Sequence, residues 1–228
     1  GKQVDEVSLR SGQPVTDLCW DYVGESLAVL QKGNPEVPIW DSTSRNVTML
    51  DTKLKNPTFL KWSSRGPQLA VGSEKGNLLI YRKDNRKLIP VAGKHSNKPI
   101  TCGAWSKDNK LALGGDDLSM TVSNAEGDTV GQTELGLAPL DVQWAGSHVA
   151  SSSSSFSSST ASSSSSSKMS DAGGKSSGGG GGGIGDLNSV ISMNLGGKRI
   201  QLYNMDNPDD PVELAFKSSY GSIVTYNW

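Results

Sequence analysis

The sequence predicts an all-β protein built of repeated antiparallel meanders, and two observations lead to that prediction. Three short runs, Ile100–Trp105, Leu111–Gly114 and Met120–Ser123, are apolar or alternating, and polar turns separate them. The same order of runs recurs upstream, at 18–41 and at 59–81. Short strands in a fixed order, each bounded by turn residues, are typical of tight antiparallel sheets.

Tryptophan spacing indicates how these meanders are arranged. The intervals between Trp20, Trp62, Trp105 and Trp144 are 42, 43 and 39 residues, close to the ~40–45 residues of a WD-type propeller blade. The sequence therefore predicts a partial WD-repeat β-propeller of about four to five blades, each an antiparallel four-stranded sheet. The first-strand tryptophans, which we expect to be core residues, are Trp20, Trp62, Trp105, Trp144 and Trp228.

The first complete unit follows an alternating stretch, Gln3–Arg10, which predicts the outer strand of an earlier blade. Trp40-Asp41, at the end of the expected third strand, is a literal WD dipeptide. The four strands expected in this unit are Val15–Trp20, Leu27–Leu30, Val37–Trp40 and Val47–Leu50.

The second unit runs from Thr58 to about Val91, and Gly76 marks the turn between its second and third strands. Its outer strand is expected at Leu88–Val91. Gly93-Lys94-His95 then resembles the Gly-His pair that often precedes the inner strand of a blade. The third unit closes with an outer strand at Thr129–Leu135.

The fourth unit is interrupted after its first strand, Leu140–Trp144. Trp144 and Tyr203 are 59 residues apart, about 40 more than in the other units. A serine- and glycine-rich block at 147–188 accounts for the excess, and its composition predicts a disordered insert in a blade turn. Later strands are expected at Val190–Met193, Arg199–Tyr203 and Ile223–Trp228, with a solvated acidic loop at Asp206–Asp210.

Composition restricts the classes of partner. The net charge is -1, so we expect no general attraction to nucleic acid. No run reaches the ~18 apolar residues of a membrane span. The two cysteines, Cys19 and Cys102, fall in expected buried strands and predict a reduced, intracellular chain. We interpret residues 1–228 as a segment of one propeller within a larger protein.

No residue is predicted to be catalytic, to bind a cofactor or to bind a metal. The glycine block lacks the preceding strand and following helix of a dinucleotide site, and Gly173–Ser176 lacks the first glycine of a phosphate-binding loop. His95 and His148 have no second ligand at zinc spacing, and His95 is expected in a turn. The acidic residues near Asp206 lack the glycine and glutamate of a calcium loop.

Two weaker alternatives concern charged residues. Basic clusters at Arg82–Lys87 and Lys94–Lys98 flank outer strands, where a solvated blade edge is expected more often than a binding patch. A propeller enzyme would need acidic residues and histidines converging at one end of several inner strands. Asp17 and Asp141 occupy such strands, but no histidine matches them.

The chain also resembles a known family. Gly76–Tyr81 (GNLLIY), Gly93–Trp105 (GKH…ITCGAW) and Leu111–Thr129 (LALGG…TVSNAEGDT) are similar to the first propeller of the largest WD-repeat subunit of intraflagellar transport complex A. The segments DNPDDPVELAF and GSIVTYNW fit the same propeller. The resemblance covers most of the chain outside the serine and glycine block.

The resemblance implies a non-catalytic scaffold subunit for retrograde intraciliary transport, cilium assembly and entry of membrane proteins into cilia. It implies other complex A subunits and ciliary cargo adaptors as partners, and the cilium or flagellum, basal body and cytoplasm as locations. An adaptor propeller of a vesicle-coat or ubiquitin-ligase complex shares the fold and is the alternative.

Overall fold

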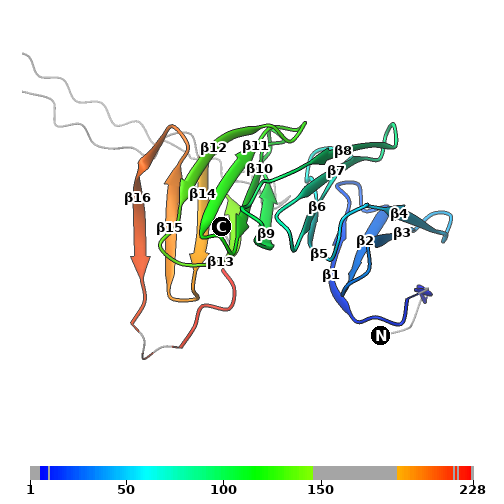
Figure 1. Cartoon of the computed structure of the whole chain (residues 1–228), viewed down its shortest axis with the longest axis horizontal. Helices are drawn as coiled ribbons and strands as arrows, with labels where there is room; N and C mark the ends of the chain where they lie inside the picture. The colour runs from blue at the N-terminus through cyan, green and yellow to red at the C-terminus, as the bar shows by residue number, and fades with distance from the viewer. Residues whose placement is uncertain (1–5, 10, 146–188, 218, 220, 227–228) are drawn as a thin grey trace, which may run out of the picture.

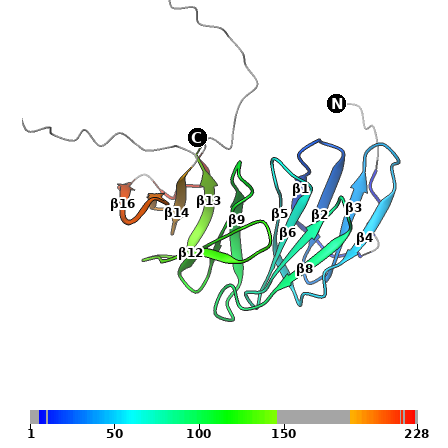
Figure 2. The same ribbon diagram turned by 90° about the horizontal axis from the view of Figure 1, so that it is seen from above.

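The computed structural model describes residues 6–9, 11–145, 189–217, 219 and 221–226. Within these residues the chain forms sixteen strands and no α-helix. The strands make four sheets of four, and each sheet is an antiparallel meander of strands that follow one another in sequence. Figure 1 shows the four sheets side by side in chain order, and Figure 2 shows the same series from above.

The strand bounds confirm the predicted meanders to within one or two residues at most ends. The first sheet contains β1 (Val15–Trp20), β2 (Ser26–Gln31), β3 (Glu36–Asp41) and β4 (Val47–Asp51). The second contains β5 (Pro57–Trp62), β6 (Gln68–Ser73), β7 (Leu78–Arg82) and β8 (Lys87–Val91). The third contains β9 (Ile100–Trp105), β10 (Leu111–Gly115), β11 (Ser119–Ser123) and β12 (Thr129–Glu134). The fourth contains β13 (Pro139–Trp144), β14 (Val190–Leu195), β15 (Arg199–Asn204) and β16 (Asn207–Ala215).

The second strand of each sheet is deeply buried, and in the third sheet β11 is as fully buried as β10. Every residue of β6, β10 and β14 is buried, because a neighbouring sheet or segment covers both faces. The apolar residues of β6 and β10 therefore follow one another without alternation, whereas β14 also buries the polar Ser192 and Asn194. Outer strands such as β12 keep exposed residues along most of their length.

Three buried apolar clusters fill the interfaces between successive sheets. One joins the first and second sheets around Leu30 and Trp62, and the next joins the second and third around Phe59 and Trp105. The last joins the third and fourth around Trp144. Each large apolar side chain buried in this way stabilises the fold by roughly 1.5–3 kcal/mol. The sheets are therefore held together in series.

Paired hydrogen bonds also cross two of these interfaces. Trp105 Nε1 donates to the carbonyl of Lys61 at 3.0 Å, and Thr58 Oγ1 donates forward to the carbonyl of Ile100 at 2.8 Å. The next interface repeats both bonds. There, Trp144 Nε1 donates to Ala104 at 3.0 Å, and Thr101 Oγ1 donates to Pro139 at 3.1 Å. β9 and β13 are thus each bonded to the first strand of the sheet before.

The expectation that the first-strand tryptophans are core residues is confirmed for three of them and wrong for Trp20. Trp62, Trp105 and Trp144 are at most 3% exposed, whereas Trp20 is 44% exposed. No described sheet precedes β1, so the face of Trp20 that would pack against such a sheet is open. Cys19, expected to be buried, is only half-buried for the same reason. Trp228 lies outside the described residues.

The acidic segment at 206–210 is not a loop, as expected, but mainly an outer strand. Asp209 and Asp210 lie in β16, which pairs with β15. Pro208 and Pro211 suggested a loop, yet an outer strand has a free edge where a missing N–H breaks no ladder bond. Proline therefore did not end the strand here.

Two terminal expectations are also corrected. Residues 6–9 of the expected strand Gln3–Arg10 are not in a strand, and its other residues lie outside the description. Residues 223–226 of the last expected strand, Ile223–Trp228, form no ladder, and its last two residues lie outside the description. They instead lie against the fourth sheet, where Ile223 N donates to Gly197 O and Gln143 Nε2 donates to Tyr226 O, both at 2.6 Å.

The interrupted fourth sheet is confirmed on both sides of the serine and glycine block. β13 ends at Trp144 and β14 begins at Val190, and the two strands are antiparallel neighbours. The insert predicted at 147–188 lies outside the described residues, as does Gly173–Ser176. In the described part, no helix is long and apolar enough to cross a bilayer.

Candidate interaction surface

The loop between β8 and β9 places His95 against the third sheet, where it is 0% exposed. Its Nδ1 lies 2.9 Å from Asp117 Oδ1, and its Nε2 lies 3.3 Å from Thr121 Oγ1. Ser119 Oγ donates to the same carboxylate oxygen at 2.8 Å. The expected turn histidine is therefore in a loop, but it is also a buried connection between two sheets.

Asp117 is the centre of this network. It lies in the turn between β10 and β11 and also accepts hydrogen bonds from the backbone N–H groups of Ser96 and Ser119, at 3.0 and 3.2 Å. Burial alone raises the pKa of the Asp117 carboxyl, but the hydrogen bonds from His95 and Ser119 outweigh it and lower the pKa below 3.8. The carboxylate therefore stays ionised and holds the loop.

Gly76 explains why the loop can approach the second sheet so closely. Its φ is +70°, and a Cβ there would lie 1.8 Å from the carbonyl oxygen of His95. The backbone N–H of His95 donates to the carbonyl of Gly76 at 3.2 Å. Any other residue at this position would push the loop away from its site.

Thr121, His95 and Asp117 have the order of a hydrolytic triad, with hydroxyl and carboxylate on opposite ring nitrogens. Thr121 and His95 are, however, only 1% and 0% exposed. A nucleophile must meet its substrate, and neither group reaches solvent. The geometry is that of a structural clamp between the second and third sheets.

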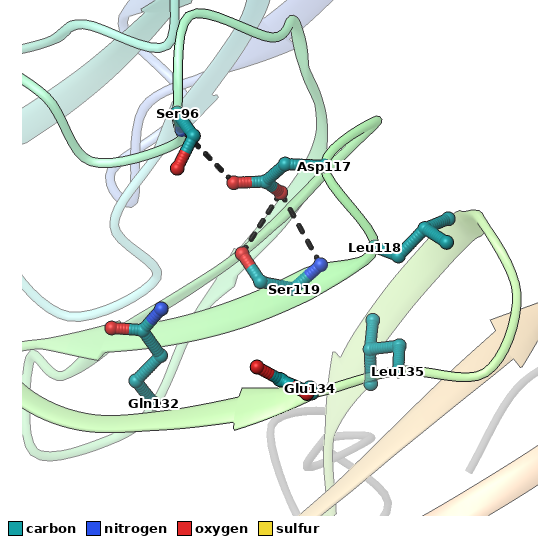
Figure 3. A pocket seen from close by; sticks show the side chains of 7 residues that line it. All are labelled: Ser96, Asp117, Leu118, Ser119, Gln132, Glu134 and Leu135. Carbon is teal, nitrogen blue, oxygen red and sulfur yellow. Dashed lines mark hydrogen bonds between the residues drawn. The ribbon is translucent and has the colours of Figure 1, made fainter.

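An open depression lies directly outside this clamp. Its volume is about 410 Å³, and Figure 3 shows its lining side chains. Ser96 and Asp117 form one wall, while Gln132 and Glu134 project from β12 on the other. The lining residues are Ser96, Asp117, Leu118, Ser119, Gln132, Glu134 and Leu135.

Leu118 is unusual among these lining residues. It has a φ of +57° and is 41% exposed. The equivalent turns of the other three sheets use glycine at positive φ, at Gly33, Gly76 and Gly196-Gly197. A left-handed conformation costs a leucine roughly 1–2 kcal/mol. The third sheet thus holds an apolar side chain out to solvent at the edge of the depression.

The two aspartates considered for a propeller enzyme lie in different sheets. Asp17 is in the first sheet and Asp141 in the fourth, so they do not form one site. Each accepts a hydrogen bond from the backbone N–H that follows it, at 2.8 and 2.9 Å. Asn46-Val47-Thr48 has the pattern of a glycosylation sequon, and Asn46 is exposed. His148 lies outside the described residues.

The basic clusters are less available than their sequence suggests. Lys94 is 8% exposed, and its Nζ donates to Thr129 Oγ1 at 2.6 Å. Burial lowers the pKa of Lys94, although Asp128 partly opposes the shift. Lys83 pairs with the buried Asp21 at 2.8 Å. These lysines connect parts of the fold instead of forming a free patch.

Sequence reasoning singled out His95 alone from this site. Asp117, Ser119, Thr121 and Glu134 were missed. A usable signal was present, because an aspartate in the turn before a Ser/Thr-containing strand follows the Gly-Lys-His segment within one unit. Among the described residues, no group of three or more His, Cys, Asp or Glu side chains is placed to hold a metal ion.

Comparison with known proteins agrees with this architecture. The family model described as "WDR19 first beta-propeller" matches residues 1–170. The WD repeat-containing protein 19 of Mus musculus is 37% identical and that of Homo sapiens 36% identical, each over the whole of this chain. WD repeat-containing protein dyf-2 of Caenorhabditis elegans is 26% identical over 93% of the chain.

These relatives are much longer proteins. The chain spans 14% of the length of the mouse and human proteins and 13% of that of dyf-2. The four sheets of the structure are blades of a partial WD β-propeller, a fold that is generally a non-catalytic scaffold. The chain belongs to the family of WDR19 first β-propellers.

Proposed function

We propose that this chain is part of the first propeller of a scaffold subunit of intraflagellar transport complex A. The observation that carries the proposal is the family match over 1–170, together with 36–37% identity across the whole chain. In this role the protein takes part in retrograde intraciliary transport, cilium assembly and the entry of membrane proteins into cilia. Its locations are the cilium, the basal body and the cytoplasm.

The proposed role is non-catalytic. The buried clamp of His95, Asp117 and Thr121 supports it, because the groups that could have done chemistry join two sheets instead. The proposed partners are other complex A subunits and adaptors for ciliary membrane proteins. Residues 1–228 would form a segment of one propeller, with 147–188 as an insert in the turn between β13 and β14.

The test is affinity purification of the tagged full-length protein from ciliated cells, followed by quantitative mass spectrometry. Recovery of the other complex A subunits in near-equal amounts is the expected result. An unrelated WD propeller with the same tag is the matched control. Recovery of vesicle-coat or ubiquitin-ligase components in their place would contradict the proposal and leave only the fold.

A further inference from the structure

The outer strand β12 has backbone hydrogen-bonding groups that point away from its sheet. Leu135 N donates to Leu118 O at 2.7 Å, and the register pairs Thr121 with Gln132 and Ser119 with Glu134. Hydrogen-bonded and non-hydrogen-bonded pairs alternate along an antiparallel ladder. Because Leu118 and Leu135 form a hydrogen-bonded pair, the pairs of Ser119 with Glu134 and of Thr121 with Gln132 are non-hydrogen-bonded. The N–H and C=O groups of Gln132 and Glu134 therefore face outward, where another strand could pair with them.

The other outer strands are less suited to such pairing. β8 carries Lys87 and Pro90, and β16 carries two prolines and two aspartates. Lysine and proline on an edge are common means of preventing further strand addition. β4 has neither proline nor lysine, but its last residue, Asp51, is ion-paired with Lys53. No residue of β4 lines the depression beside Gln132 and Glu134. β12 has no proline and no lysine.

The depression lies on the face of β12 from which Gln132 and Glu134 project (Figure 3). A strand added beside β12 would place alternate side chains over the same face. The residue opposite Glu134 would be about 4.5–5.5 Å away between Cβ atoms, where an opposite charge is favourable. Leu118, which is 41% exposed, and Leu135 form an apolar end to the depression next to Glu134.

We propose that β12 and this depression bind an extended segment of a partner protein by strand addition, with a lysine or arginine facing Glu134 and an aliphatic residue on Leu118 and Leu135. Backbone pairing along β12 supplies affinity, and the depression supplies selectivity. The Glu134 carboxylate has no ion-pair partner in the part of the chain that the structure describes, and Asp116 is exposed in the adjacent turn, so a basic segment is favoured over an acidic one. This inference rests on the proposed scaffold function and gives the chemistry of one partner segment.

The experiment is selection of a phage-displayed library of random dodecapeptides on the full-length protein, with counter-selection on its Gln132→Pro variant. Proline at 132 removes an outward N–H and leaves the β11 ladder intact. The expected enrichment is for peptides with a basic residue within two positions of an aliphatic one. Enrichment of acidic peptides, or no enrichment, overturns the proposal.

Affinities of the enriched peptides then test the geometry. Gln132→Pro and Glu134→Lys should each weaken binding by about tenfold or more, a change of ~1.4 kcal/mol. The matched control is Met49→Pro, because Met49 pairs with Pro38 and likewise directs its N–H outward from β4. Equal loss with Met49→Pro, or no loss with Glu134→Lys, would show that β12 is not the site.

Two further outcomes separate the proposals. If wild-type protein self-associates and Gln132→Pro makes it monomeric in analytical ultracentrifugation, the occupant of β12 is a second copy, and a heterologous basic segment is ruled out. If basic peptides bind β12 but purification recovers no complex A subunits, the proposed function fails and the binding site stands. If those subunits are recovered but no peptide is enriched, the proposed function stands and the proposed binding site fails.

Discussion

The inner strands β1 and β9 share one sequence pattern but differ in environment. Both are six-residue strands that end in tryptophan, yet Trp105 is 3% exposed and Trp20 is 44% exposed. Trp105 packs on the second sheet and donates to Lys61 O. Trp20 instead makes an edge-to-face contact with Trp40 of its own sheet, at 5.9 Å between ring centroids.

The difference shows that the sheet before it provides the burial of each first-strand tryptophan. Trp105 and Trp144 each donate to the first strand of the preceding sheet. Trp62 is equally buried, but its Nε1 meets no acceptor among the described residues, and its backbone N–H instead approaches Cys19 Sγ at 3.5 Å. The interface between the first two sheets is therefore less regular than the two that follow.

The largest expected effect comes from removing a buried tryptophan. Trp105→Ala should lower the free energy of unfolding by ~3–5 kcal/mol, because it leaves a cavity between the second and third sheets. Trp20→Ala is the matched control and should cost about 1 kcal/mol, the value of an aromatic pair. Urea unfolding of both variants of the 228-residue chain measures the difference. Equal losses of unfolding free energy in the two variants would contradict the difference in environment between β1 and β9.

The next effect concerns the clamp at the same interface. Asp117→Asn should cost about 1.5–3 kcal/mol at neutral pH, since it weakens hydrogen bonds to a charged group. The native pKa of Asp117 lies below 3.8, so its contribution is fully present above pH 3.8 and is lost as the pH falls through the native value. The variant should therefore lose less stability on acidification than the wild type. A parallel pH dependence of unfolding in both proteins would argue against the clamp.

A smaller effect is expected where residues 221–226 lie on the fourth sheet. This contact is polar: Ser192 Oγ donates to Tyr226 Oη at 3.1 Å, and Asn194 Nδ2 donates to Ile223 O at 3.1 Å. Burial raises the pKa of Tyr226. Tyr226→Phe should weaken the contact by about 0.5–1.5 kcal/mol. Hydrogen exchange at the Ile223 amide should become faster while exchange in β10 is unchanged.

The smallest effect is expected at the strained leucine. Leu118→Gly removes left-handed strain but increases the freedom of the unfolded chain, so stability should stay within ~1 kcal/mol of the wild type. Leu118→Val should be less stable than either, because a β-branched residue tolerates positive φ poorly. Thermal unfolding of the three proteins gives the order. A valine variant as stable as the glycine variant would contradict the conformation of Leu118.

Much of the fold could be predicted from local sequence. Alternation, turn residues and tryptophan spacing placed nearly all strands, because each meander is specified by residues close in sequence. The outer strand β16 was missed, since proline tolerance depends on whether a strand is at an edge. The exposure of Trp20 was missed because it depends on a neighbouring sheet rather than on β1 itself.

The candidate site was harder to predict. His95, Asp117 and Thr121 come from a loop, a turn and a strand, and only the packing of the second sheet on the third brings them together. The depression likewise depends on the separation between the 92–99 loop and β12. This separation cannot be inferred from residue spacing or from composition.

The most direct test of the series packing is hydrogen exchange at the indole N–H groups of the 228-residue chain, followed by NMR. The Nε1–H groups of Trp105 and Trp144 are bonded to carbonyls of the preceding sheet and should be strongly protected. The Nε1–H of Trp20 should exchange at once. Equal protection of Trp20 and Trp105, or rapid exchange at Trp144, would contradict the account in which each sheet buries the tryptophan of the next.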